Sequence, residues 1–418
     1  MKDPANVLRI LLILMFGFVP IVSAQPPAGA ADDHQLIEQL LDRVKDLEAE
    51  VKRLRGAPDT PAVEPKATVA AAPDVSSPGA GGAMHEPSTD AAHDAGIPNM
   101  QFRGFSDIDY RVSDHDQPST FSFGQFTLFI TSRLSDQFSV LGEVVIEADG
   151  TNAVGVDLER LLFRYTPNDY FNLSVGRYHT GIGYYSTAFH HSAWMQTTTG
   201  RPLLFEFEDG GGILPIHNVG LSATGRIPSG AFGLHYIAEI GNGRTSRSPL
   251  LVTVQNKQDE NNGKSVNFGV LSRPKAMPGF EAGVSIYHDR LYPDSGLNIV
   301  QNIFSAHAIY EGSRFEFLNE VVVLRHTVDS THRDFTIPAY YSQISKPFGK
   351  VRPYLRYEYI NVPRDAPFFA DVGLRHGPIA GIRYDFSEFA AYKLEYFRLN
   401  QRDLPAINGL RTQVSFTF

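Results

Sequence analysis

Two groups of charged residues in this sequence have the right types and spacing to set an electric field across a water-filled passage. The acidic group lies in the segment 205–212, which contains Glu206, Glu208 and Asp209. The basic group comes from the last part of the chain and comprises Arg352, Arg356, Arg383, Lys393 and Arg411. If the groups face each other where a passage is narrow, low-dielectric walls concentrate the field and a few charges decide which solutes pass.

A second interpretation of the basic group stays open. Carboxylates lie in the same segments as several of these basic residues. The basic side chains then form ion pairs within the wall instead of facing the passage. The candidate partners are Glu358, Asp385 and Glu395.

Four histidines raise the possibility of a metal site. His179, His190, His191 and His217 fall in or beside one stretch that lacks strand character, and converging imidazoles bind Zn²⁺ or Cu²⁺. No HExxH spacing is present, and two adjacent histidines on a strand point apart. The sequence therefore predicts no metal site and no cofactor.

Other chemistry is excluded by composition and by missing motifs. The chain has 418 residues and no cysteine, so it has no disulfide, no thiolate site and no acylated cysteine anchor. It contains no GxSxG, no P-loop and no dinucleotide-binding motif. Its net charge of -9 gives no basic field for nucleic acid. We expect no catalytic residues and no enzymatic activity.

Period-two alternation dominates the chain after residue 98. At its end, Leu410, Val414 and Phe418 alternate with Arg411 and Gln413. Similar alternation recurs in sixteen segments, at about 101–111, 121–133, 137–148, 155–166, 170–178, 217–227, 230–241, 265–273, 279–289, 302–311, 313–325, 334–346, 350–361, 374–386, 389–399 and 408–418. In the clearest of these segments, charges fall on the face opposite the aromatic residues, as in strands with one face toward lipid and the other toward a lumen.

The fold class that follows is all-β, a transmembrane antiparallel β-barrel of about sixteen strands over residues 99–418. Backbone groups in a bilayer must all be paired, and strands achieve this only in a closed sheet. Such a barrel resembles the bacterial porins, in which a long loop after the fifth strand folds into the lumen. The longest stretch without a strand here, about 179–216, follows the fifth predicted strand, and the resemblance implies that it also folds inward. A mean hydropathy of -0.18 fits such a barrel, because alternate residues face lipid and water.

The first 98 residues differ from the rest of the chain in composition and lack the alternating pattern. Residues 1–24 are predicted to be a signal peptide, since a basic start precedes an apolar run and small residues end it; an uncleaved anchor is the alternative. Residues 57–98, rich in Ala, Pro and Gly, are predicted to be a linker without aromatics.

Residues 34–56 are predicted to form a short coiled coil. Apolar residues there are spaced alternately by three and four, with β-branched residues at a and leucine at d. These core positions are Ile37, Leu40, Val44, Leu47, Val51 and Leu54. Three heptads are short for independent stability, and a solitary amphipathic helix is the alternative. The residue types at heptad positions a and d favour a coiled coil of two helices.

The alternating strands, the terminal Phe418 and the N-terminal layout resemble bacterial outer-membrane porins. Signal, short coiled coil and barrel together are similar to the phosphate-selective porin O/P group, although only six lysines follow residue 98, which argues against phosphate selectivity. The segment Phe205 to Gly212 resembles the tip of a porin constriction loop without its leading proline.

The resemblance implies partners and a location. It implies passive diffusion of small hydrophilic solutes or ions through a charged lumen, in a homotrimer surrounded by outer-membrane lipid. The N-terminal segment would be periplasmic and able to contact the cell wall. Neutralising the three acidic residues of 206–209 would then shift ion preference toward anions. A non-channel barrel acting as an enzyme or surface scaffold, and a secreted soluble β protein, remain as alternatives.

Overall fold

The computed structural model describes residues 99–115, 118–148, 153–189, 193–208, 210–244, 258–259, 261–293 and 296–418. The predicted signal peptide, coiled coil with its core positions Ile37 to Leu54, and linker lie outside the described residues, as do Asp209, His190 and His191. No helix in the described part of the chain is both long and apolar enough to cross a membrane.

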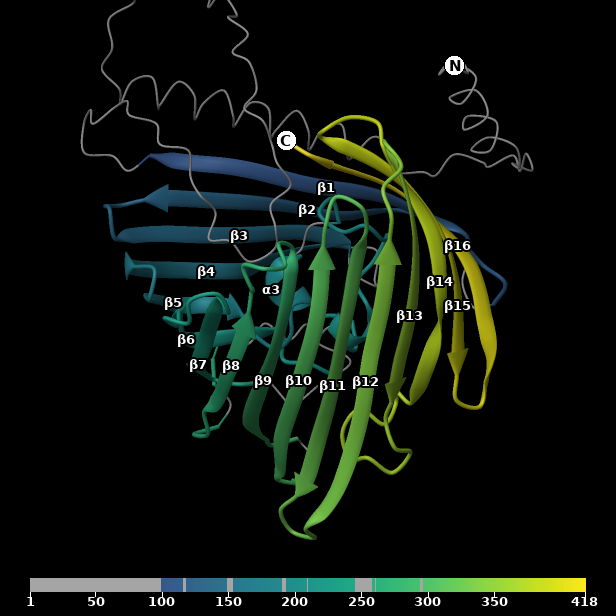
Figure 1. Cartoon of the computed structure of the whole chain (residues 1–418). Helices are drawn as coiled ribbons and strands as arrows, with labels where there is room; N and C mark the ends of the chain where they lie inside the picture. Colours follow the sequence, from purple (N-terminus) through teal and green to yellow (C-terminus); the bar gives the residue numbers. More distant parts are fainter. Residues whose placement is uncertain are drawn as a thin grey trace, which may run out of the picture. The chain divides into compact units, whose positions relative to one another are not determined.

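Sixteen strands account for most of the described chain (Figure 1). They are β1 Met100–Ser113, β2 Thr120–Arg133, β3 Phe138–Ala148, β4 Val154–Asn168, β5 Phe171–His179, β6 His217–Arg226, β7 Leu234–Gly241, β8 Ser265–Ser272, β9 Phe280–Leu291, β10 Ile299–Glu311, β11 Glu316–Val328, β12 Arg333–Ser345, β13 Val351–Asn361, β14 Leu374–Asp385, β15 Ala390–Gln401 and β16 Leu404–Thr417. Each predicted segment corresponds to one of them. The expected strand count is confirmed.

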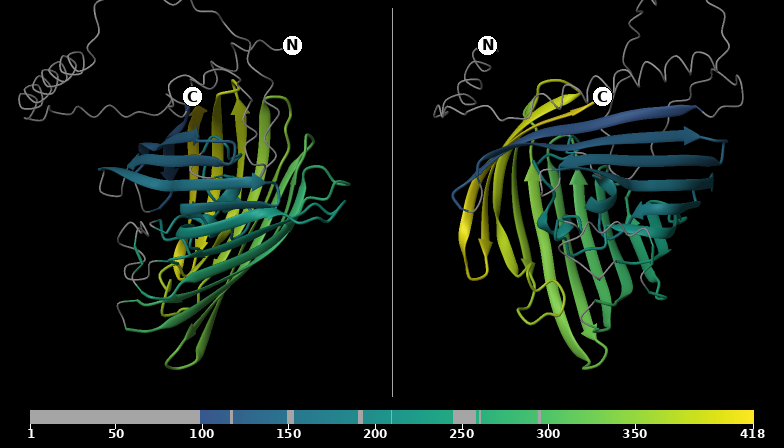
Figure 2. Two further views of the ribbon diagram at one scale, coloured as in Figure 1. Left: turned by 90° about the vertical axis from the view of Figure 1, so that its left-hand side faces the viewer. Right: turned by 180° about the vertical axis from the view of Figure 1, so that it is seen from behind.

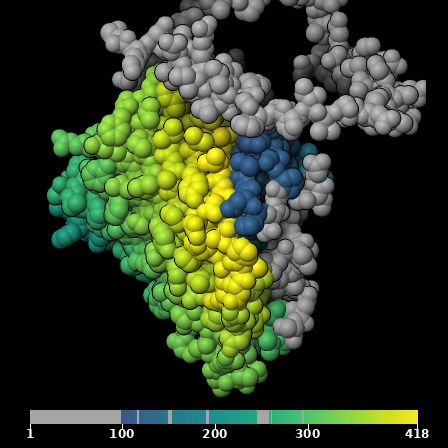
Figure 3. Space-filling model, turned by 90° about the vertical axis from the view of Figure 1, so that its right-hand side faces the viewer, coloured from purple at the N-terminus to yellow at the C-terminus, as the bar shows by residue number. Residues whose placement is uncertain are grey.

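The sheet is antiparallel throughout and closes on itself (Figures 1 and 2). Each strand pairs with its neighbour in sequence, and β1 pairs with β16 from Phe105 opposite Thr417 to Ser113 opposite Gly409. Figure 3 shows this seam as blue N-terminal strands beside yellow C-terminal ones. Gly104 and Phe418 exchange backbone hydrogen bonds of 2.8 and 3.0 Å, which extends the closure to the last residue.

The alternation in the sequence explains the two faces of the sheet. Along β11, Glu316, Leu318 and Glu320 are buried inside, while Phe317 and Val321 are exposed on the outer surface. Aromatic side chains are also exposed at the edge where the chain of the barrel begins and ends, including Phe102, Phe138, Phe171, Phe315, Phe348, Phe389 and Phe418. Bacterial barrels place such an aromatic belt at the membrane interface.

The two edges of the barrel differ in their connections. Short turns, such as 134–137, 169–170 and 312–315, join strands at the edge where β1 begins and β16 ends. The opposite edge carries the longer connections, above all 180–216 and 242–264. This asymmetry is typical of bacterial outer-membrane barrels, whose short turns are periplasmic.

Part of the interior is apolar. Connections 180–216 and 362–373 contribute side chains such as Tyr185, Phe205 and Phe369 to a buried cluster against the inner face of the wall. The wall residues of this cluster include Ile303, Leu318, Val322, Leu324 and Ile337. The inner face of β10–β12 therefore carries apolar residues at these positions, beside polar ones such as Gln301, Glu320 and Gln343, and is not polar throughout. The physical reason is that the inner loops carry apolar side chains, which need an apolar wall to bury them.

Candidate functional site

The connection between β5 and β6 supplies the centre of the candidate site. Residues 180–216 contain the short helix α3 (Tyr185–Ala188) and the 3-10 turn η1 (Leu203–Phe205). Tyr185 stacks on Phe205, and both rings meet Tyr341 of β12 edge-on at about 6 Å. The loop therefore packs inside the barrel and does not extend away from it.

A buried carboxylate fixes the start of this loop. Glu320 of β11 accepts hydrogen bonds from the backbone N–H groups of Tyr184 and Tyr185, at 2.6 and 3.0 Å. It also accepts the hydroxyl of Tyr341 at 2.7 Å. On another strand, Glu239 accepts the N–H of Gly181 at 2.9 Å. Neither carboxylate was among the predicted site residues, because nothing in the strand pattern indicates which loop residue it meets.

The predicted basic group does face the interior, but it binds the loop. The Lys393 ammonium donates to the carbonyl oxygen of Thr198 at 2.8 Å and also to that of Ala193. Arg383 donates to the carbonyls of Trp194 and Gln196 at 2.7 and 2.9 Å. Arg356 adds a bond of 3.0 Å to the carbonyl of Gly200. Segment 193–200 is therefore held against β13–β15.

The ion pairs that the sequence analysis left open are also present. Arg356 lies 2.9 Å from Glu358, Arg383 lies 2.8 Å from Asp385, and Arg411 lies 3.7 Å from Glu395. Arg352 pairs with Glu316 of β11 at 3.5 Å. Each basic side chain except Lys393 thus has a carboxylate in its own wall or the adjoining one. Pairing of this kind weakens the field across the barrel.

The acidic group does not form a single cluster. Glu208 is buried against β6, where its carboxylate accepts the backbone N–H of His217 at 2.9 Å and contacts the Nδ1 of that ring at 3.0 Å. Glu206 is only half-buried, and its nearest charged neighbours are on the loop and the basic wall. The two carboxylates of 206–208 therefore play different parts.

The pKa values of these two loop residues move in opposite directions. Burial raises the pKa of the Glu206 carboxyl to about 7, although Arg201 opposes the shift. Burial would also raise the pKa of Glu208, but the charge of His217 and its hydrogen bonds hold it below the usual value. Near neutral pH, Glu206 is therefore the loop acid that changes its charge.

The contacts show that the loop crosses the barrel. One end is bound to β6 through Glu208, and segment 193–200 is bound to β14 and β15. In the closed order of strands, β6 and β14 are eight places apart, which is half of the circumference. A loop attached to both of these strands divides the lumen.

Water reaches part of the basic wall. The side chains of Arg352 and Arg411 keep 32% and 33% of their surface exposed, and that of Asp385 keeps 34%. Their partners Glu316 and Glu395 are more deeply buried, at 12% and 1%. Arg352 and Asp385 lie near the short-turn ends of β13 and β14, whereas Arg411 lies near the middle of β16.

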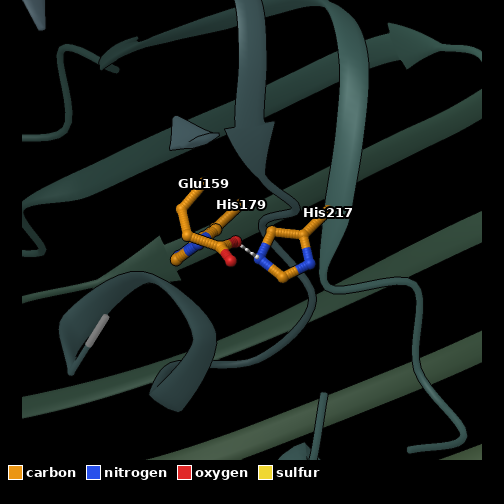
Figure 4. A group of neighbouring side chains, drawn as sticks. All are labelled: Glu159, His179 and His217. Carbon is orange, nitrogen blue, oxygen red and sulfur yellow. Dashed lines mark ion pairs between the residues drawn. The ribbon is translucent and has the colours of Figure 1, made fainter. Parts of the chain in front are cut away.

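Two of the four histidines come together. His179 ends β5 and His217 begins β6, and the two residues are directly paired in the ladder with ring centroids 5.0 Å apart. Glu159 of β4, which the sequence analysis missed, lies beside both rings (Figure 4). This group lies at the base of the loop, on the side away from the basic wall.

Comparison with solved structures finds outer-membrane porins and channels. The anion-selective porin from Comamonas acidovorans has a TM-score of 0.57 at 13% identity over 77% of this chain and 100% of that one. The OmpF protein of Salmonella typhi has a TM-score of 0.51 at 12% identity, over 77% of this chain and 98% of that one. The outer membrane channel DcaP of Acinetobacter baumannii has a TM-score of 0.51 at 9% identity, over 77% of this chain and 97% of that one.

The sequence itself is similar to no curated protein, and no family model matches it. At these identities the structural likeness concerns the fold. The barrel has the fold of the bacterial outer-membrane porins, as the sequence resemblance implied.

Proposed function

We propose that this chain is an outer-membrane channel for passive diffusion of small hydrophilic solutes or ions. The observation that carries the proposal is a loop bound to opposite walls beside inward-facing charges that keep about a third of their surface exposed. Barrels of sixteen strands are wide enough to leave an aqueous channel. A loop across such a lumen narrows it and brings solutes close to the wall charges.

The exposed charges favour anions at this constriction. Arg352 and Arg411 present their guanidinium groups to the interior, while the carboxylates that pair with them are more buried. Asp385 opposes this preference for anions, because its carboxylate is more exposed than its partner Arg383. On the basic wall, two exposed arginines against one exposed aspartate support a modest anion preference, which is largest when Glu206 is protonated. The anion-selective porin that is similar in fold has this preference by its name.

The proposal extends to location and assembly. The exposed aromatic belt supports insertion in outer-membrane lipid, with the short-turn edge in the periplasm. The N-terminal segment would then lie in the periplasm, because β1 begins at that edge. We further propose a homotrimer whose N-terminal segments contact one another and the cell wall.

Conductance in a planar lipid bilayer tests the channel directly. The purified full-length protein is expected to insert in discrete current steps, with a reversal potential that indicates a modest anion preference in a salt gradient. Membranes with the protein incorporated but without steps would refute the proposal.

The alternative of a non-channel barrel is favoured by one observation. The apolar cluster formed by loops 180–216 and 362–373 fills space along β9–β13. If this cluster closes the barrel, solutes cannot pass, and the protein acts as a scaffold or an enzyme. The same bilayer experiment separates the two, because a closed barrel inserts without conducting.

Lowering the pH is expected to increase anion preference through Glu206. Its carboxyl has a pKa of about 7, so it is mostly ionised at pH 8 and mostly protonated at pH 6. The charged groups around it are Arg201, Glu358, Arg411 and Arg356. Loss of one negative charge there should raise the chloride-to-potassium permeability ratio about 1.5- to 2-fold.

Reversal potentials measured from pH 8 to pH 6 check this expectation. The Glu206→Gln variant should show the low-pH ratio at both pH values, since its side chain stays neutral. The Glu208→Gln variant serves as the matched control, because Glu208 is bound to His217 and its pKa lies below the usual value. If wild type and Glu206→Gln respond equally to pH, Glu206 does not influence ions in the passage.

A further inference from the structure

Three residues of metal-binding types meet at the base of the loop. Glu159, His179 and His217 are 4%, 6% and 5% exposed, and their ligand atoms all lie within 4.8 Å of one another. Figure 4 shows the carboxylate of Glu159 between the two rings, with an ion pair to His217. The residues come from three consecutive strands, β4, β5 and β6.

A β-bulge directs Glu159 toward the histidines. In the β3–β4 ladder, Glu143 pairs with Arg160 and Val144 pairs with Leu158, so Glu159 is the extra residue. As a result Glu159 and Arg160 are both buried on the inner face, although neighbours on a regular strand point to opposite faces. The bulge is the local feature that brings a carboxylate into this group.

The outer contacts of both rings suit metal ligation. The Nδ1 atom of His179 is 3.1 Å from the carbonyl oxygen of Ser186, and a carbonyl only accepts, so Nδ1 carries the proton. In this tautomer the lone pair is on Nε2, the nitrogen that faces the group. For His217, Nδ1 faces the carboxylate of Glu208 at 3.0 Å and Nε2 faces Glu159 at 2.6 Å. A carbonyl or carboxylate behind each ligating histidine is the usual second shell of a metal site.

We propose that Glu159, His179 and His217 bind a divalent transition-metal ion of the zinc type. Two imidazole nitrogens and one carboxylate oxygen form a three-ligand set that leaves a fourth position for water. The nitrogen ligands favour such a metal over Ca²⁺ or Mg²⁺, which prefer oxygen. Zinc ligands lie about 2.0–2.2 Å from the ion, so closing the present group around it requires only small side-chain movements.

A protonated His217 is the competing occupant of this place. An imidazolium between Glu159 and Glu208 satisfies both carboxylates without a metal, and the Arg177 guanidinium also lies 3.8 Å from the Glu159 carboxylate. Proton and metal cannot both occupy Nε2 of His217. Metal binding therefore releases a proton, which a binding experiment in buffers of different ionisation enthalpy measures.

The position of the site gives the metal a structural role. His179 and His217 are the residues between which the whole loop 180–216 lies. A metal on both joins the two ends of the loop to each other and to β4. Bound metal should therefore hold the base of the loop more firmly than the hydrogen bonds alone do.

Calorimetric titration of the full-length protein in detergent with ZnCl₂, after treatment with a chelator, tests the proposal. We expect one zinc ion per chain with a dissociation constant of about 1 µM or lower, and release of about one proton. The His179→Gln and His217→Gln variants should each bind at least about tenfold more weakly. Co²⁺ in place of Zn²⁺ should give the visible absorption of a four- or five-coordinate site, which is lost in both variants.

Two controls separate this site from other histidines. His307→Gln changes a buried histidine that also faces a glutamate, Glu281 at 3.2 Å, and should bind zinc as wild type does. A His190→Gln/His191→Gln variant should also bind normally. Absence of stoichiometric binding, or binding that survives in His179→Gln and His217→Gln, overturns the proposal. Because the titration measures no current, its failure leaves the proposed channel untouched, and a barrel that does not conduct leaves the metal site untouched.

Discussion

Replacing Lys393 and Arg383 together by methionine is expected to increase single-channel conductance about twofold or more by releasing loop segment 193–200 from the wall. These two side chains donate hydrogen bonds to four backbone carbonyls of the segment, those of residues 193, 194, 196 and 198. Methionine has a similar length but no donor. Four acceptors, two of them buried and two part-buried, then lose these partners, which favours movement of the segment away from β14 and β15.

High salt separates widening of the passage from the change in charge. The double variant also removes two positive charges, which alters ion preference at low ionic strength. In 1 M KCl the screening length is about 3 Å, so conductance then depends mainly on the width of the passage. The single tryptophan, Trp194, lies in the released segment with its ring 4.7 Å from the Arg383 guanidinium, and its emission should shift in the double variant.

The matched control removes the same two charges elsewhere. Lys350 and Arg325 are exposed residues of a turn and of the outer face, so the Lys350→Met/Arg325→Met variant should conduct as wild type does in 1 M KCl. If the Lys393→Met/Arg383→Met variant shows unchanged conductance and unchanged tryptophan emission, these side chains do not hold the loop.

Strand positions and faces were accessible from the sequence because a strand repeats every two residues. Once Leu410 and Phe418 are assigned to the lipid face of their strand, Arg411 has to face inward, because neighbouring side chains on a strand point to opposite faces. The same alternation puts Arg352 and Lys393 on the inner faces of their own strands. The loop between β5 and β6 was also predicted, since no alternation spans it. All of these predictions depend on local spacing alone.

Contacts between distant segments were not accessible in this way. The extra residue of the bulge in β4 reverses the parity at Glu159, and a single sequence gives no sign of it. Glu206 and Glu208 are two residues apart and were treated as one acidic group, yet Glu208 binds His217 and Glu206 does not. The inner apolar wall, including Leu318 and Val322, was missed because burial against a loop and burial against lipid produce the same side-chain types.

The largest loss of stability is expected from Glu143→Leu, which breaks the ion pair with Arg160 between β3 and β4. The two side chains are 0% and 6% exposed, and the guanidinium also lies over the ring of Phe129 at 5.2 Å. Removing the carboxylate leaves a buried cation without its counter-charge, which costs about 3–5 kcal/mol in comparable cases. The free energy of unfolding, obtained from urea titrations of the refolded barrel and followed by heat-modifiable migration on gels, measures this loss.

A double variant distinguishes the cost of an isolated charge from lost packing. Glu143→Leu/Arg160→Met replaces both partners by apolar side chains of similar size, and it should recover most of the stability lost in Glu143→Leu. Arg226→Leu, which breaks the exposed pair of Arg226 with Asp169, should change stability far less. If Glu143→Leu is instead as mild as Arg226→Leu, water must reach the Arg160 guanidinium. The lumen beside β3 and β4 would then be wet at the depth of this pair, and the proposed passage would extend along that wall.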